Sequence, residues 1–459
     1  MRKFSYESVL FQLSGYIHHA TTQEKDKVMA PWIAERLALW VIRDDVRAYG
    51  QRHMQSAELG KCLNMAWNDM DSQFQWFSPG APLHLSIRSL LLAQIPHQRD
   101  QEMGPFGRQI DLLNRLEPNS RLYQLFEKRL GISPTDYLAM AVLFRLNSLK
   151  DMSRVLTAKY RSEMRGVFGP VAADRFYNTL LIPRETTAEQ MRNVDPDEWF
   201  QPNLLYRSPF TVYDGKWFFW GRCGLDRHLE FALSDIVGAS DDAAARRLFE
   251  DLFEEYVGRS LVRTGAEVLN ENEVRVRFGV DGGCCDYAVL DGDSVILLEV
   301  KNKALAHTVP ASATVRTYRS KLKTTVFKAA DQLRNTAHFV CRAIPSATVH
   351  RVTVTYGDLF VAEADHFFDE QSTEFQSDEP VFIMSVDHMD RLVEAVRLGQ
   401  CSFVSFFDDF AKRRREPADR LFALSELLNH EPYRLGQPPK HVTEIYTPFL
   451  EGMMARCHA

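Results

Sequence analysis

The sequence lacks the features that mark membrane, disulfide-rich and zinc-finger proteins. No apolar run approaches the roughly 18 to 20 residues that a bilayer span requires. The seven cysteines are dispersed and odd in number, and none has zinc-site spacing, so we expect neither a disulfide framework nor a zinc finger. The amino-terminal segment has no uninterrupted apolar core and no small-residue cleavage site, which predicts a cytoplasmic protein without a membrane partner.

Two further motifs are missing. The fourteen histidines form no metal-binding pair at the i, i+4 spacing of a helix, and no Gly-rich phosphate loop of the Walker kind is present. We therefore do not expect a motor driven by nucleoside triphosphates.

The composition is that of a globular protein long enough for two or three domains, with 459 residues of which 45% are hydrophobic and 25% are charged. The 55 basic and 61 acidic residues give a net charge of −6, which argues against nonspecific coating of nucleic acid. Residues 301–330, however, contain no acid. The basic residues of this run are Lys301, Lys303, Arg316, Arg319, Lys321, Lys323 and Lys328. A polyanion could dock at this basic run although the whole molecule is negative.

Hydrophobic periodicity divides the chain into four ranges. We expect a mainly helical recognition or regulatory domain over 1–205 and a hairpin and helix connector over 206–244. An α/β domain follows over 245–400, and a helical extension follows over 401–459. The connector contains Asp214-Gly215 between two aromatic and β-branched runs, which is a hairpin signal.

The order of elements in the third range predicts an α/β fold. An amphipathic helix over 241–265 precedes three short strands, which we expect at 273–280, 284–290 and 294–300. A basic loop leads to a second helix, which a buried strand and a shorter strand follow. This order is typical of a mixed β-sheet flanked by helices, here behind a mainly α-helical N-terminal domain.

A group of charged residues lies at the end of one of these strands. If Asp291-Gly292 is a two-residue turn, Leu290 pairs with Asp293 and Asp286 pairs with Leu297. Because side chains alternate faces along a strand, the acids at 286 and 299 and the lysine at 301 then share one face.

Charges near a core lose hydration unless something compensates them. A divalent cation of the Mg²⁺ type could be held by Asp286, Glu299 and the Val300 carbonyl, with Lys301 assisting an attacking water. A cation held in this way, with a lysine beside it, can hydrolyse a phosphodiester bond. The alternative is a surface ion pair between Glu299 and Lys301, which needs no metal.

Asp286 followed by Glu299-Val300-Lys301 at the end of a hydrophobic strand resembles the PD-(D/E)xK nuclease superfamily. The resemblance covers about 245 to 360 and implies a restriction-endonuclease-like core. Phe253-Glu254-Glu255-Tyr256-Val257 is similar to the superfamily's helical acid context, which implies Glu254 as a third catalytic carboxylate, with Glu250 as the alternative. Two departures are Cys285 in place of a proline before the aspartate and the absence of a tyrosine after Gln332 at RecB-like spacing.

The resemblance implies a metal-dependent nuclease that uses Mg²⁺, for which Mn²⁺ can substitute. DNA is the expected substrate and RNA is the alternative, and the superfamily's frequent role in prokaryotic defence against phage is the implied context. The helical domain would receive a protein or nucleic-acid trigger. The competing interpretation is a nuclease-like scaffold that binds nucleic acid or protein without hydrolysis. The residues expected to contact nucleic acid are Lys303, Arg316, Arg319, Lys321, Lys323 and Gln332.

Overall fold

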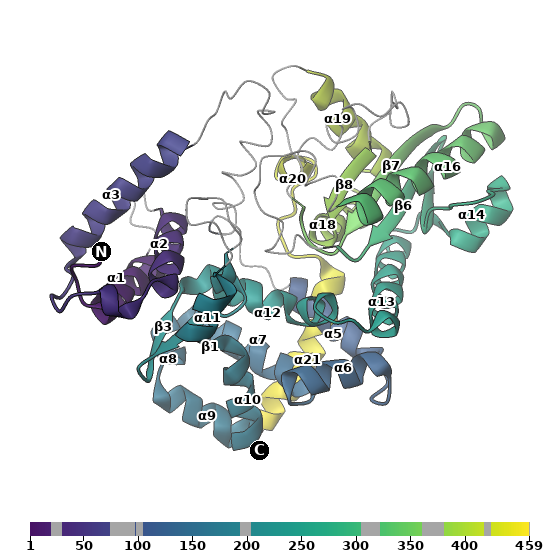
Figure 1. Cartoon of the computed structure of the whole chain (residues 1–459). Coiled ribbons are helices and arrows are strands. Elements are labelled where there is room, and N and C mark those ends of the chain that lie inside the picture. The colour runs from purple at the N-terminus through teal and green to yellow at the C-terminus, as the bar shows by residue number, and fades with distance from the viewer. Residues whose placement is uncertain are drawn as a thin grey trace.

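The computed structural model describes residues 1–19, 30–73, 97, 104–192, 203–303, 322–359, 381–416 and 424–458. Within these residues the chain is an α/β protein in which helices flank two mixed sheets (Figure 1).

The first part of the chain is mainly helical, as expected. One of its helices begins at Pro134, and the Ser133 hydroxyl accepts a hydrogen bond from the Asp136 N–H, because a capping hydroxyl followed by proline favours a helix start. The helices are α1 (Tyr6–His19), α2 (Pro31–Arg43), α3 (Ser56–Gln73), α5 (Gly104–Asn114), α6 (Arg121–Leu130), α7 (Pro134–Lys150), α8 (Met152–Val155), α9 (Ala158–Phe168), α10 (Pro170–Leu180) and α11 (Arg184–Gln190), with short 3₁₀ turns at Val46–Ala48 and Leu204–Tyr206.

A small sheet follows these helices in the order β1 (Leu181–Pro183), β2 (Phe210–Tyr213) and β3 (Lys216–Phe219). Strands β2 and β3 form the expected hairpin. Asp214 and Gly215 have φ values of 48° and 72°, which is the conformation that an Asp-Gly turn supplies. Helix α12 (Gly221–Gly238) comes next.

The larger sheet has the strand order β4-β5-β6-β7-β8. The first two neighbouring pairs are antiparallel and the last two are parallel. The strands are β4 (Glu267–Asn270), β5 (Tyr287–Asp291), β6 (Ser294–Lys301), β7 (Thr348–Thr355) and β8 (Val381–Ser385). The remaining helices are α13 (Ala243–Val262), α14 (Glu271–Phe278), α16 (Lys328–Ala343), α18 (Val386–Arg397), α19 (Phe403–Arg415), α20 (Leu424–Leu427) and α21 (Lys440–His458).

The expectation of a strand at 273–280 is wrong, because most of this segment forms α14 and the antiparallel strand lies just before it in β4. The alternation of Val and Arg has a period of two, but local signals favour a helix. Asn270 and Glu273 form a capping box, and Gly279 ends the helix with a φ of 69°. Val274 and Phe278, four residues apart, are both buried, which matches a helical face.

The two faces of the larger sheet contact different cores. Helices α14 and α16 cover the face that carries Val295 and Leu297. Helices α13, α18 and α19 pack on the face that carries Ile296 and Leu298. This second core also contains residues of α5 to α10 and α21, so it joins those helices to the larger sheet. Helices α1, α2 and α3 pack in a separate core with β3. The four-range domain division stays a prediction.

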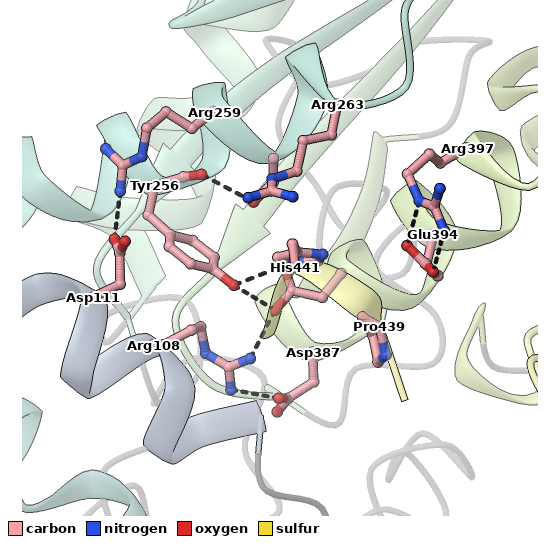
Figure 2. A network of polar contacts seen from close by, with 12 residues as sticks. Arg108, Asp111, Tyr256, Arg259, Arg263, Asp387, Glu394, Arg397, Pro439 and His441 are labelled. Carbon is pink, nitrogen blue, oxygen red and sulfur yellow. Dashed lines mark hydrogen bonds and ion pairs between the residues drawn. The ribbon is translucent and has the colours of Figure 1, made fainter. Parts of the chain in front are cut away.

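Helix α13 is held to the helical part by a buried polar junction (Figure 2). The hydroxyl of Tyr256 donates to Asp390 Oδ2 at 2.9 Å, and His441 Nε2 lies 3.0 Å from the other oxygen of the same carboxylate. Arg108 from α5 lies 2.8 Å from Asp390 and also pairs with Asp387. Because a buried charge is costly without partners, this junction of α5, α13, α18 and α21 fixes the position of α13.

On its other side α13 makes a close approach to the sheet at Gly258. A Cβ at this position would lie only 2.7 Å from Cε1 of Tyr287, and the Tyr287 hydroxyl donates to the Glu254 carbonyl at 3.2 Å. The glycine therefore lets α13 lie directly against β5.

We predict that Gly258→Ala lowers the free energy of unfolding by about 1 to 3 kcal/mol, because the added methyl group displaces the Tyr287 ring. The control is Gly238→Ala in α12, where an added Cβ meets nothing within 4 Å. Urea unfolding of both variants checks this; equal midpoints for the two variants would contradict the close approach.

Candidate active site

The acids predicted at the end of β6 do meet, although the expected register is wrong. Asp291 pairs with Ser294 and Tyr287 pairs with Leu298, so Asp286 lies opposite Glu299 rather than Leu297. The turn is Gly292-Asp293, because Gly292 takes the positive φ of 61°. The shift from the expected pairing is two residues on the partner strand, so the face assignment is unchanged.

Glu299 is completely buried in β6, with 0% of its surface exposed. One of its oxygens forms an ion pair with Lys301, whose side chain is 20% exposed. The other oxygen, Oε2, has no hydrogen-bond partner in the described part of the chain. Burial, followed by the charge of Asp286, raises the pKa of Glu299 to about 8 despite the opposing effect of Lys301. A carboxyl group that is so poorly compensated favours its neutral form.

Asp286 precedes β5 and contacts the β6 backbone. Its Oδ2 accepts a hydrogen bond of 2.6 Å from the Val300 N–H. Burial raises the pKa of Asp286, while that hydrogen bond and Lys301 act in the opposite direction. A strand residue directs its N–H and C=O to the same side, so the Val300 carbonyl also lies on the side of Asp286.

Glu254 reaches this group from α13. Burial, then the charges of Asp286 and Glu271, raise the pKa of Glu254 to about 7, and Lys301 lowers it. Glu250, the alternative one turn earlier, is exposed. The structure therefore places Glu254 rather than Glu250 within electrostatic reach of the two strand acids.

Sequence reasoning missed two charges that act here. Glu271 at the start of α14 raises the pKa of Asp286 and of Glu254, whereas Lys328 at the start of α16 lowers that of Asp286. Lys328 was visible only as a member of the basic run. Glu271 lies beside a segment whose alternation indicated a strand, so no sequence signal pointed it toward the site.

Three polar side chains of α16 bind the backbone that leads into Asp286. Gln332 Nε2 donates to the Cys284 carbonyl at 3.1 Å. Asn335 Nδ2 donates to the carbonyls of Asp281 and Gly283 at 2.7 and 2.6 Å, and Thr336 accepts from the Cys285 N–H at 3.0 Å. These three residues form an α16 clamp that fixes Asp286 beside Glu299. Sequence reasoning selected Gln332 for nucleic-acid contact and missed the other two.

The clamp leaves one group without a partner. Oε1 of Gln332 is buried and has no hydrogen-bond partner among the residues that the structure describes. Because its amide nitrogen donates to the Cys284 carbonyl, Gln332 positions the loop that leads into Asp286.

Only part of the basic run lies in the described residues. Lys303 follows β6 with its N–H bonded to the Lys301 carbonyl at 2.6 Å, and Lys323 is exposed at the start of a π-helical turn, Lys323–Phe327, before α16. Arg316, Arg319 and Lys321 lie outside the described residues.

Carboxylate oxygens are the donor atoms that a hard cation prefers, but the acids of this site are not yet close enough together to coordinate one. Among the described residues no three His, Cys, Asp or Glu side chains are close enough to form a ready metal site. The free Oε2 of Glu299, however, is the kind of donor atom that Mg²⁺ takes. A cation there would also offset the repulsion that raises the pKa of both Glu299 and Glu254.

Comparison with family models, with curated proteins and with solved structures found no match to this chain. In the part of the chain that the structure describes, no helix is both long and apolar enough to cross a membrane.

The raised pKa values predict how stability changes with pH in metal-free protein. The ordinary pKa of a glutamate is 4.5, whereas that of folded Glu299 is about 8. Between these pH values the folded state holds more protons than the unfolded chain, so the free energy of unfolding falls as pH rises. We predict that the free energy of unfolding of the wild type falls by on the order of 2 kcal/mol between pH 5 and 8 because of Glu299, and that this fall is absent in Glu299→Gln.

Urea unfolding in EDTA at several pH values measures this difference. Glu255→Gln is the matched control, because Glu255 is exposed on the same helix as Glu254. Parallel pH profiles for the wild type and Glu299→Gln would contradict the raised pKa.

Proposed function

We propose that this protein is a metal-dependent nuclease of the PD-(D/E)xK type, with a restriction-endonuclease-like core and DNA as its substrate. The observation that supports it most is the buried Glu299, which lies opposite Asp286 with one oxygen unpartnered among the described residues. A purely structural sheet gains nothing from this arrangement, since it leaves a carboxyl group without hydration or full compensation.

Asp286, Glu299 and the Val300 carbonyl would hold Mg²⁺, or Mn²⁺ in its place. When bound, the cation supplies Lewis-acid stabilisation of charge on a phosphate and lowers the pKa of a coordinated water. Lys301 neutralises negative charge at the same place, because its partly exposed ammonium group lies beside Glu299. Glu254, with a pKa of about 7, can accept a proton from the attacking water near neutral pH.

The basic run would contact the phosphate backbone of the nucleic acid. Two members of this run lie in the described residues: Lys303 follows β6, and Lys323 precedes α16. In this proposal Arg316, Arg319 and Lys321 share that role, and Gln332 contributes by holding the loop that leads into Asp286. The helical part would receive the trigger in a cytoplasmic defence system against phage.

Two observations favour the competing function of an inactive scaffold. Lys301 already pairs with one oxygen of Glu299, and the described acids do not form a ready metal group. A scaffold could therefore keep the ion pair as a structural element. Activity measurements separate the two functions.

We predict that the protein nicks or linearises plasmid DNA with Mg²⁺ or Mn²⁺ but not in EDTA. Asp286→Ala and Lys301→Ala should each lower the cleavage rate by at least about 100-fold, because each removes a charge at the reacting centre. Gel assays on plasmid, linear DNA and RNA measure the rates. Unchanged cleavage in both variants would reject the site, and no cleavage of any nucleic acid would favour the scaffold.

The two helical acids provide a matched comparison. Glu254→Gln should slow cleavage by about 10- to 100-fold because a group that accepts a proton is lost, whereas Glu250→Gln on the exposed face should leave the rate unchanged. The pH dependence of the wild-type rate should include an ascending limb near pH 7 that Glu254→Gln lacks. Equal rates for the two variants would remove Glu254 from the mechanism.

The basic run predicts salt-dependent binding. Neutralising Lys321 and Lys323 together should weaken DNA binding and reduce the slope of log affinity against log salt by about 2. The loss of two phosphate contacts lowers the number of counterions that are released on binding. Fluorescence anisotropy in Ca²⁺ at several salt concentrations measures the slope. The control neutralises Lys128 and Lys150 in the helical part, and an equal slope in both double variants would exclude the role.

A further inference from the structure

A second unusual charge lies outside the candidate active site, in the helical part of the chain. Arg145 of α7 is completely buried, with 0% of its surface exposed. It forms an ion pair with Asp226 of α12, whose Oδ1 lies 3.1 Å from Arg145 Nε. Apart from this ion pair, Nε, Nη1 and Nη2 of Arg145 make no hydrogen bond among the described residues. A guanidinium group has five N–H donors, so Arg145 keeps donors for a further acceptor.

A second guanidinium group, Arg222, lies close by. It sits in the first turn of α12 and donates from Nη2 to the Ser148 carbonyl at 3.1 Å, while its buried Nε has no acceptor in the described part of the chain. Burial, then the charge of Arg145, lowers the pKa of Arg222, and Asp226 opposes this. The two guanidinium groups therefore repel each other in a partly desolvated place, and the charge of Asp226 acts on both.

The start of α12 adds to this positive potential. The helix has 18 residues, and its N-cap residue, Trp220, makes no side-chain capping bond. Uncapped N–H groups and the aligned peptide dipoles make a helix N-terminus attractive to anions. Three features of one place thus favour the same kind of ligand: a buried guanidinium group that keeps donors for a further acceptor, a second arginine and an uncapped helix start.

We infer that the start of α12, together with Arg145 and Arg222, is a binding site for a phosphate-type oxyanion. The two terminal nitrogens of Arg145 present the parallel donors that a tetrahedral oxyanion accepts in bidentate fashion. Arg222 is only partly buried, so it lies at the solvent side of the site and supplies the second contact. The anion is either free phosphate or the phosphate group of a larger molecule such as a nucleotide. This inference is independent of hydrolysis at the sheet.

Thermal unfolding of the full chain in EDTA tests the site, with sodium phosphate compared with sodium chloride at equal ionic strength. We expect phosphate to raise the wild-type midpoint saturably by about 2 °C, since a ligand that binds only the folded state stabilises it. Arg222→Gln should lose this rise. Arg246→Gln, which removes an exposed arginine from α13, should keep it.

Two further arms sharpen the result. Arg145→Met should be insensitive to phosphate, and if this buried substitution prevents folding, Arg222→Gln decides alone. AMP and ATP distinguish the sources: saturation at lower concentration than phosphate assigns the site to a nucleotide, and weaker binding assigns it to the free anion. No rise in wild type with phosphate, AMP or ATP, or an equal rise in Arg222→Gln, overturns the inference.

Discussion

Helix α13 packs against the larger sheet on one side and against the helices on the other, and the arrangement of the molecule depends on both contacts. Toward the sheet, Gly258 permits contact with Tyr287, and the same turn presents Glu254 to the strand acids. Toward the helices, Tyr256 enters the buried junction with Asp390 (Figure 2). A displacement of α13 that relieved one surface would break the other, because the two sets of contacts are only two residues apart. The position of Glu254 is therefore tied to the packing of the helical part.

The candidate site and the start of α12 share one physical property, which is charge that the protein itself does not fully neutralise. Around Glu299 the charges of other acids raise its pKa, and around Arg145 a second guanidinium group acts beside the Asp226 carboxylate. Such places lower the stability of the folded chain, and a bound ion of opposite charge would recover that cost. The junction at Asp390 is different, because its arginine, tyrosine and histidine all contact the carboxylate that they surround. The carboxylate at that junction is surrounded by partners, whereas Glu299 and Arg145 each have one ion pair and further polar atoms without a hydrogen bond in the described part of the chain.

Local signals in the sequence predicted local structure, such as the hairpin at Asp214-Gly215. The shared face of Asp286 and Glu299 was also predicted, since an error of two residues in the register keeps side chains on the same face. The helix α14 was missed because its capping signals competed with an alternating pattern. The α16 clamp was out of reach, because its bonds join residues about fifty positions apart in the chain and nothing local marks such contacts.

Helix α21 packs against α5 near the middle of the helical part (Figure 1). Met453 of α21 thus belongs to the same core as Phe106, and His441 contributes to the polar junction at Asp390. During translation, residues near Phe106 leave the ribosome long before their partners in α21 exist, so this core stays open until α21 has been made. Until then, the nascent chain exposes apolar helix faces that α21 later covers.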